Sequence, residues 1–352
     1  HWTVQHNAGQ TFFTLNDVFF VDDNVGTAVG ENGTILRTTN SGISWSPQND
    51  SGTSYTLNAV SFVNVDTGLA VGDYGTILKT TNGGKTWRSK SSGTLNILFG
   101  VAFINQNNGV IVGGGGSILN TTDGGETWGR ILTSTTSDLY DVSFPSDNVG
   151  KIVGKQGTIL HTIDGGRTWF TILPVIDPSV AIRSVIFTDP NTGIAVTEQG
   201  TILRTTNGGS SWNTKLFSPS RKLFGVSSST VTTGVAVGEY GTILSISTNQ
   251  EWKYTSTGIT IDNLSGISII DRDNAFAVSS NGNTFQTTNG GTNWHLLPKI
   301  TNYGFNAASF TDVDNGIIVG DQGTIFRLTQ GGESWEEHSF PTPSSLRGVS
   351  FI

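Results

Sequence analysis

Short apolar runs alternate with polar, glycine-rich punctuation along the whole chain. In one stretch, residues 57–63 (LNAVSFV), 68–72 (GLAVG) and 75–81 (GTILKTT) are rich in apolar and β-branched side chains, and a fourth short run follows Thr86-Trp87. Gly, Asn and Asp residues separate these runs. Such runs between turn residues predict antiparallel strands joined by hairpins. The stretch therefore predicts one four-stranded antiparallel sheet, and nothing in it resembles a helix of three turns.

The pattern recurs about every 41 residues, and a tryptophan marks each recurrence. The nine tryptophans are spaced 40 to 43 residues apart, at Trp2, Trp45, Trp87, Trp128, Trp169, Trp212, Trp252, Trp294 and Trp335. A repeat of this length indicates a repeat architecture, and one four-stranded sheet per repeat, arranged radially, is a β-propeller blade. We predict an all-β propeller of eight blades, with seven or nine as the alternatives.

A single propeller domain then covers residues 1–352. The predicted blades span residues 15–56, 57–97, 98–138, 139–181, 182–222, 223–263, 264–304 and 305–345. An orphan outer strand at 2–6 (WTVQH) and an orphan inner strand at 346–352 (LRGVSFI) remain outside them. Because propellers normally close by pairing the two ends of the chain, we expect residues 2–6 to close the eighth blade while Trp335 leads into further sequence. The alternatives are a segment of a larger propeller or tandem array, and strand addition from one molecule to the next.

The first strand of each repeat reads L-x-x-V-x-F, as in Leu15, Val18 and Phe20. Small residues precede the valine position at Ala59, Gly100, Ser184, Gly225, Gly266 and Ala307. They predict the innermost strand, which runs close to a crowded axis. Glycines such as Gly33 and Gly75 end the turn between the second and third strands, where a tight hairpin needs a positive φ.

The third and fourth strands meet at variants of T-[NDI]-x-G-x-[ST]-W. The Asn or Asp side chain can accept backbone N–H bonds and close its own turn, and we expect the tryptophan to wedge between neighbouring sheets, where its burial contributes roughly 1.5–3 kcal/mol. The predicted structural positions are Asn40, Trp45, Asn82, Trp87, Asp123, Trp128, Asp164, Trp169, Asn207, Trp212, Asn289, Trp294 and Trp335.

The run G-T-I-L-x-T-T-[ND]-G-G-x-[ST]-W resembles the Asp-box (BNR-like) repeat, in the version typical of photosystem II stability/assembly factor-like propellers and related bacterial secreted propellers. Eight copies cover essentially the whole chain; the sixth is degraded at residues 247–252, and the eighth carries Gln330 in place of Asn or Asp. The resemblance implies a chaperone-like role in which one propeller face grips a protein partner. Asp boxes also occur in sialidases, xyloglucanases, sorting receptors and bacterial surface proteins, so the motif specifies the fold more than the function.

Composition narrows the classes of partner and the compartment. The net charge of −8 and the pI of about 5.0 argue against nucleic acid or an anionic membrane surface, and no apolar run approaches a membrane span. Cysteine is absent, which excludes disulfides and thiolate metal sites. Methionine is also absent, including an initiator. With a surface rich in Thr, Ser, Asn and Gly, this predicts a processed export signal and an extracellular, cell-surface or periplasmic location.

The residues expected of a catalytic site are missing. The five histidines have no metal-ligand spacing. Asp-box sialidases need an arginine cluster with a tyrosine and an acid, whereas Arg37, Arg204 and Arg327 recur at equivalent strand positions, which indicates blade surface. Two carboxylates at a suitable separation would suffice for a glycoside hydrolase, so that alternative stays open. We predict no catalytic residue, no cofactor and no metal.

Three groups of residues are candidates for binding. The residue after the leading Leu or Ile of the first strand is aromatic or basic in four successive repeats, which would form a stacking arc for a sugar or a peptide; alternatively, the rings pack between blades. The arc comprises Phe99, Tyr140, Arg183 and Phe224, with Tyr74 and Tyr240 at flanking turn tips.

The second group is a broken acidic ring at the tips of the turns between the second and third strands. It would dock a basic partner or a cation, although polar residues also simply suit solvated tips. Its members are Glu31, Asp73, Glu198, Glu239 and Asp321, opposed by Lys155. The third group is the acid-rich turns at 22–24, 271–274 and 312–316, which resemble calcium loops but lack the bidentate glutamate. Turn formation is the favoured interpretation of these.

Together these features predict a non-catalytic, secreted or cell-surface binding or scaffold propeller that contacts a protein partner or a surface glycan. The alternatives are a carbohydrate-binding or glycoside-hydrolase propeller that uses the arc, and a subunit that self-assembles through its terminal strands.

Overall fold

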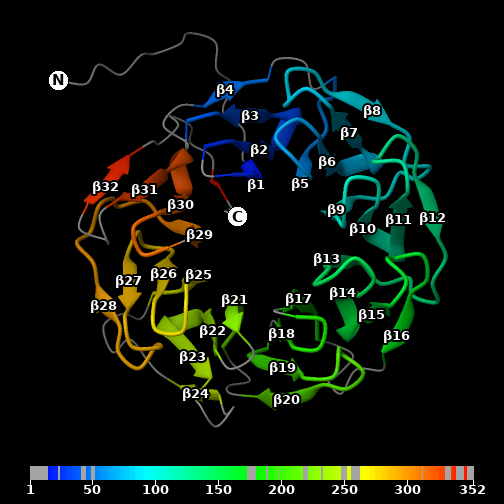
Figure 1. Cartoon of the computed structure of the whole chain (residues 1–352). Coiled ribbons are helices and arrows are strands. Elements are labelled where there is room, and N and C mark those ends of the chain that lie inside the picture. Colours follow the sequence, from blue (N-terminus) through cyan, green and yellow to red (C-terminus); the bar gives the residue numbers. More distant parts are fainter. Residues whose placement is uncertain are drawn as a thin grey trace.

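The computed structural model forms a ring of eight four-stranded antiparallel sheets around a common axis, as Figure 1 shows. It describes residues 15–22, 24–40, 45–48, 52–172, 180–187, 189–197, 199–216, 221–230, 233–246, 252–254, 262–310, 312–329, 334–337 and 345–346. The prediction of an eight-bladed β-propeller is confirmed.

Within the described ranges, each blade consists of four strands that are consecutive in the chain. Blades 1 and 2 contain β1 (Leu15–Phe20), β2 (Gly26–Gly30), β3 (Ile35–Thr38), β4 (Ser46–Pro47), β5 (Leu57–Phe62), β6 (Gly68–Gly72), β7 (Ile77–Thr80) and β8 (Arg88–Lys90). Blades 3 and 4 contain β9 (Leu98–Phe103), β10 (Gly109–Gly113), β11 (Ser117–Thr121), β12 (Gly129–Ile131), β13 (Leu139–Ser143), β14 (Gly150–Gly154), β15 (Ile159–Thr162) and β16 (Phe170–Ile172). Blades 5 and 6 contain β17 (Ile182–Phe187), β18 (Gly193–Thr197), β19 (Thr201–Thr205), β20 (Asn213–Leu216), β21 (Leu223–Thr230), β22 (Thr233–Gly238), β23 (Thr242–Ile246) and β24 (Trp252–Tyr254). Blades 7 and 8 contain β25 (Leu264–Ile269), β26 (Ala275–Ser279), β27 (Thr284–Thr287), β28 (His295–Leu296), β29 (Phe305–Phe310), β30 (Gly316–Gly320), β31 (Ile325–Thr329) and β32 (Ser334–Glu337).

The small residues of the first strand lie where neighbouring blades approach most closely. A Cβ on Gly266 in β25 would lie 2.9 Å from the Cα of Ala307 in β29, the innermost strand of the next blade. Two backbones can pass this closely only where at least one residue lacks a side chain. The prediction that these small residues mark the innermost strand is confirmed.

Six turns between the second and third strands are single turns of 3-10 helix: η1 (Glu31–Gly33), η2 (Asp73–Gly75), η3 (Gly114–Gly116), η4 (Lys155–Gly157), η5 (Glu239–Gly241) and η6 (Asp321–Gly323). In η2, φ is +54° at Tyr74 and +68° at Gly75. A Cβ on Gly75 would lie 2.0 Å from the Thr94 carbonyl oxygen, so glycine is required there. The turns therefore contain the predicted positive-φ glycine and, in front of it, a second left-handed residue that the sequence did not reveal.

The Asp-box residues close their turns through side-chain bonds to the backbone. Asn82 Oδ1 accepts the Thr86 N–H at 3.0 Å, and Thr80 Oγ1 accepts the Gly84 N–H at 2.8 Å. Trp87 then packs edge-on to Phe62 of its own blade, with ring centroids 6.0 Å apart. The same indole belongs to a buried cluster that includes residues of blade 1, so the predicted wedge between sheets is confirmed.

One equivalent arginine position lies between blades rather than on the blade surface. Arg37 on β3 is buried; its guanidinium donates to Thr27 at 2.8 Å and to the Val65 carbonyl of blade 2 at 2.6 Å, and it lies 5.2 Å from the Phe62 ring. The expectation of a blade-surface arginine is wrong for Arg37, because its apolar stem covers the neighbouring sheet while its head bonds to that sheet's backbone.

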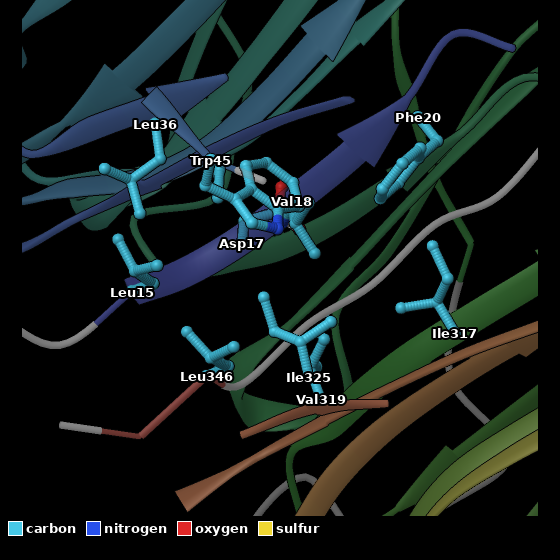
Figure 2. A pocket seen from close by; sticks show the side chains of 11 residues that line it. Leu15, Asp17, Val18, Phe20, Leu36, Trp45, Ile317, Val319, Ile325 and Leu346 are labelled. Atoms are coloured by element: carbon cyan, nitrogen blue, oxygen red, sulfur yellow. Dashed lines mark hydrogen bonds between the residues drawn. The ribbon is translucent and has the colours of Figure 1, made fainter. Parts of the chain in front are cut away.

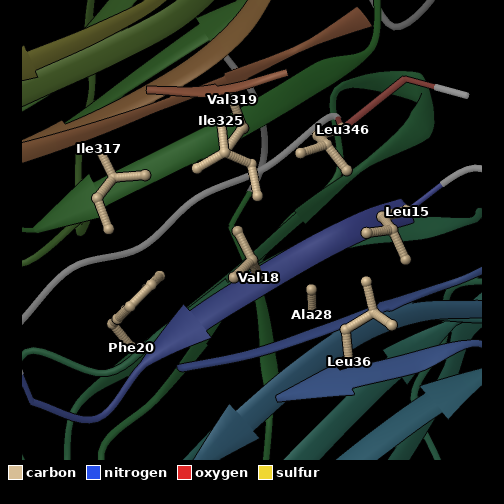
Figure 3. Close-up of a cluster of buried hydrophobic side chains, with 9 residues drawn as sticks. All are labelled: Leu15, Val18, Phe20, Ala28, Leu36, Ile317, Val319, Ile325 and Leu346. Atoms are coloured by element: carbon tan, nitrogen blue, oxygen red, sulfur yellow. The ribbon is translucent and has the colours of Figure 1, made fainter. Parts of the chain in front are cut away.

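The ring closes between blades 8 and 1, at an interface that we call the seam. Its core combines residues from both blades with Leu346, and Figure 3 shows them converging: Leu15, Val18, Phe20, Ala28, Leu36, Ile317, Val319, Ile325 and Leu346. A void of only about 10 Å³ remains between them, which is no more than a single water needs (Figure 2). The side chains at the seam therefore leave little empty space, although the innermost strands β29 and β1 contact each other less than those of the other neighbouring blades, and Leu346 lies in the core of the seam.

The strand that completes blade 8 differs from the expectation. β32, which contains Trp335, pairs antiparallel with β31 and takes the outer position. The expectation that residues 2–6 fill this position is wrong, because the strand that directly follows β31 needs only a short turn to pair with it. Residues 2–6 and 347–352 lie outside the described residues. Leu346 forms a parallel bridge with Leu15, and its N–H donates to the Gly320 carbonyl at 2.7 Å.

Candidate binding site on the tip face

The turns η1 to η6 and the beginnings of the innermost strands lie on the same face of the ring, which we call the tip face. In blade 2, Leu57 pairs with Gly72, and the Asp73 N–H donates to the Thr56 carbonyl at 2.9 Å. The arc residues follow the leading Leu or Ile, and the acidic tips lie in the turns. The topology therefore brings both predicted groups to one face.

On one half of the ring, the residue after the leading position ties its blade to the next. Three asparagines and a serine donate from their side chains to a backbone carbonyl about 40 residues ahead. For Asn16, Asn58 and Ser265 this is the leading carbonyl of the following blade, at Leu57, Leu98 and Phe305, and for Asn306 it is the carbonyl of Leu346 beside Leu15. We call these bonds the clamps, and they belong to blades 1, 2, 8 and 7. Each clamp gives a hydrogen-bond partner to the backbone carbonyl of a buried residue.

On the other half, blades 3 to 6 carry the predicted arc at the clamp position. Phe99 on β9 and Tyr140 on β13 are half-buried and meet edge to face, with ring centroids 5.7 Å apart. Phe224 on β21 is 40% exposed. Arg183 lies on β17, and its side chain is outside the described part. We call Phe99, Tyr140 and Phe224 the aromatic half-rim.

Three of the acidic tips accept structural bonds from their own blades or from the segment just before them. Asp73 accepts from the Asn58 side chain at 3.0 Å and Asp321 from Asn306 at 3.1 Å, so these tips also orient the clamps. Glu239 accepts the Lys222 N–H at 3.0 Å. Glu31 is exposed, and Glu198 lies outside the described residues.

The two tip tyrosines have different neighbours. Tyr74 packs against Tyr55, with ring centroids 4.7 Å apart and planes tilted by 34°. The Arg221 guanidinium lies 5.7 Å from the centre of the Tyr240 ring. Each tyrosine therefore contacts the segment that leads into its own blade.

A set of acceptors that the sequence analysis missed faces the innermost strands. Asp17 Oδ2 accepts the Val60 N–H of the next blade at 2.9 Å, and Asp141 Oδ2 accepts the Val185 N–H at 3.2 Å. Asp17 keeps some accessible surface, but protein surrounds its carboxyl group. Burial raises the pKa of Asp17 to about 7, against the opposing effect of the Val60 and Val18 N–H groups. The sequence could have revealed them, because Asp17 and Asp141 directly precede the valine of the first strand, where the other repeats have a small residue.

A second missed feature is a buried cation between blades 4 and 5. Lys151 on β14 has no exposed surface, and its Nζ has no hydrogen-bond partner among the described residues. It lies 5.3 Å from the Phe187 ring centre, and burial lowers its pKa to about 8. His161, its cross-strand partner, also has a lowered pKa, because of burial and then the Lys151 charge. Lys151 occupies the strand position that is Leu69 in blade 2, and nothing in the sequence around it indicates a partner for its charge.

The acid-rich turns between the first and second strands are closed by their own side chains. Asp271 Oδ1 accepts the Asp273 and Asn274 N–H groups, both at 2.8 Å, and Asp312 does the same in blade 8. These bonds agree with turn formation. Within the described ranges, no three His, Cys, Asp or Glu residues are grouped to hold a metal ion, and no helix is long and apolar enough to cross a membrane.

The fold and the tip face define an eight-bladed β-propeller with an aromatic half-rim. The chain belongs to the family described as photosynthesis system II assembly factor YCF48, whose model matches residues 2–95 and 89–295. A search of curated proteins found no match.

Solved structures share the fold. A structure of YCF48 bound to D1 peptide has a TM-score of 0.59 and 20% identity, covering 78% of this chain and 92% of that chain. The computationally designed Ika8 protein has a TM-score of 0.69 and 14% identity, covering 94% and 98%. An ancestral GH74 enzyme has a TM-score of 0.55 and 12% identity, covering 94% and 64%. At these identities, the similarity concerns the fold alone.

Proposed function

We propose that this propeller is a non-catalytic binding module that holds an extended segment of a protein partner on its aromatic half-rim. The observation that carries the proposal is that the residue after the leading Leu, Ile or Phe differs between the two halves of the ring. Blades 7, 8, 1 and 2 use it to tie neighbouring blades together, whereas blades 3 to 6 place aromatic or basic residues there. Family membership and the peptide bound to a YCF48 structure support a protein partner.

The half-rim has the chemistry of a peptide site. Rings of Phe and Tyr offer large, rigid contact areas with little loss of side-chain entropy on binding. An extended peptide could place its apolar side chains against Tyr140 and Phe224.

A catalytic role has less support on this face. The Asp73, Glu239 and Asp321 carboxylates each accept a bond that shapes a turn or a clamp. A general acid or base needs a carboxyl group that is free to face the substrate. We therefore propose that the tip face binds without turnover, in an extracellular, cell-surface or periplasmic setting that the Thr-, Ser- and Asn-rich composition favours.

The test is binding of the labelled protein to an array of unstructured 15-residue peptides. The double variant Tyr140→Ala/Phe224→Ala should lose at least 10-fold in affinity for the peptides that the wild type selects. The matched control is Phe170→Ala, which removes a 59% exposed ring from the outer strand β16, and it should bind as the wild type does. Equal binding by the double variant, with an unchanged circular dichroism spectrum, would overturn the proposal. Fractionating the source cells tests the location separately.

A further inference from the structure

Away from the aromatic half-rim, the tip face of blade 2 contains an open groove with a volume of about 560 Å³. Three segments form it: the β4–β5 connection at 52–55, the turn η2, and β8 with the following connection up to Leu95. The volume lies within the usual range for small-molecule sites.

Two tyrosines form one wall of the groove without a role in the core. Tyr55 is 47% exposed and Tyr74 is 61% exposed, and their tilted rings contact each other. Tyr74 also has a φ of +54°, a conformation that disfavours bulky side chains. The equivalent position in η1 is Asn32, so the turn itself does not require an aromatic ring. An exposed ring on a strained backbone, packed against a second exposed ring, points to a ligand.

The other walls offer hydroxyl groups and backbone rather than free charge. Ser89 and Ser91 line the groove and are exposed, and Gly75 has no side chain, which lets the Thr94 carbonyl oxygen approach it closely. Among the described residues that line the groove, Lys90 is the one charged residue, and its Nζ pairs with Glu126 at 2.5 Å. The described lining therefore offers no free counter-charge to a charged ligand and matches a neutral, hydroxyl-rich molecule.

We propose that this groove binds a neutral oligosaccharide, independently of the peptide site on the half-rim. The apolar face of a pyranose ring would stack on Tyr74 and Tyr55, while its hydroxyl groups bond to Ser89, Ser91 and the backbone. Sugars combine an apolar ring face with polar edges, and the tilted aromatic pair and the hydroxyl walls offer both kinds of contact in one groove.

The test is isothermal titration calorimetry of the full chain with cellotetraose, xylotetraose and maltotetraose. We expect at least one to bind, and Tyr74→Asn to weaken that binding at least 10-fold. Asparagine is tolerated at this turn position in η1, so the variant should fold. The matched control is Tyr240→Asn at the same turn position of blade 6, where φ is also +54° and Arg221 lies over the ring; its binding should be unchanged.

Three results would overturn the proposal. The first is no binding of any of these sugars at millimolar concentration. The second is equal weakening by Tyr74→Asn and Tyr240→Asn. The third is binding of a proline-rich peptide that Tyr74→Asn abolishes, which would make the groove a peptide site. The variant Tyr140→Ala/Phe224→Ala should leave sugar binding intact, so that failure here is distinguishable from failure of the peptide site.

Discussion

Asn306 donates from its side-chain amide to the Leu346 carbonyl at 2.8 Å, as Asn16 does to Leu57 at 3.0 Å. Leu346 is thus bound as though it were the leading residue of another blade, although Leu15 already leads blade 1. The two leucines lie side by side, and both enter the core of the seam, as Figure 2 shows.

We expect Leu346→Ala to lower the free energy of unfolding by about 2–3 kcal/mol, because truncating a buried leucine loses transfer free energy and leaves a cavity. Leu346 is only 3% exposed, and the void beside it would grow. Urea denaturation followed by tryptophan fluorescence measures the change. Leu132→Ala, at a position that is 83% exposed, should change it by less than about 0.5 kcal/mol. Equal effects would mean that Leu346 does not seal the seam.

The Asp17 carboxyl group should make the protein less stable as the pH rises from 4 to 7. Its pKa is raised to about 7 in the folded state, against about 3.9 in the unfolded chain. The folded protein therefore binds more protons in this window, and the stabilisation that is full below pH 4 is lost as the pH approaches 7. The free energy of unfolding should fall by at most about 4 kcal/mol across this window, because a difference of 1 in pKa corresponds to about 1.4 kcal/mol.

Asp17→Asn should flatten this slope when unfolding is measured in urea at pH 4.5 and pH 8. The control is Asp271→Asn, because hydrogen bonds from Asn274 lower the pKa of Asp271 and place its contribution below pH 4. That variant should keep the wild-type slope between pH 4 and 7. A slope that survives in Asp17→Asn would assign it to another group.

Lys151→Met should stabilise the protein at pH 7 by about 1–3 kcal/mol, because it removes a buried ammonium group without a carboxylate partner. Since the folded-state pKa of Lys151 is lowered to about 8 from 10.5, the unfolded chain binds more protons between these values. Wild-type stability should therefore rise over pH 8 to 10.5, and the variant should lose this rise.

The control for Lys151 is Lys79→Met. Lys79 is also buried, but its Nζ pairs with Glu126 at 2.7 Å. Guanidinium denaturation should show no stabilisation in this variant. If both methionine variants were equally stabilising, apolar packing rather than relief of an unpaired charge would be the cause.

Gly266→Ala and Gly225→Ala occupy equivalent positions in neighbouring blades and should differ sharply. A Cβ on Gly266 would meet the Ala307 backbone at 2.9 Å, whereas one on Gly225 would be 3.5 Å from its nearest neighbour. We expect a loss of more than about 2 kcal/mol for the first and less than about 1 kcal/mol for the second. Thermal melts followed by circular dichroism would decide, and similar melting temperatures would show that the blades can separate at little cost.

Features that depend on local sequence were predictable. The Asn82 turn and the Trp87 wedge need only a few neighbouring residues and the blade geometry, so most repeats carry the same signal, with departures in the sixth and eighth. The aromatic half-rim was also predictable as a set of residues, because Phe99 and Tyr140 occupy equivalent positions in the repeat.

Contacts between blades were not predictable in the same way. Asp17 bonds to Val60, 43 residues away, and only the curvature of the ring brings the two together. Arg37 was predicted to lie on the blade surface. Comparing the repeats gives its position along the strand, but it does not show which face of the sheet the next blade covers. The closing strand was also misassigned, because β32 and residues 2–6 carry the same pattern.

The seam also differs from the other interfaces in how its two blades are joined. Seven of the eight interfaces between blades are backed by the chain that runs from one blade into the next, but at the seam Leu346 and the packed side chains hold blade 8 to blade 1. We expect a pull on the ring to separate the described residues first at the seam, because only non-covalent contacts among them hold blade 8 to blade 1 there. In the described residues, the ring is thus a series of eight sheets that the chain links at seven interfaces and that non-covalent contacts close at the eighth.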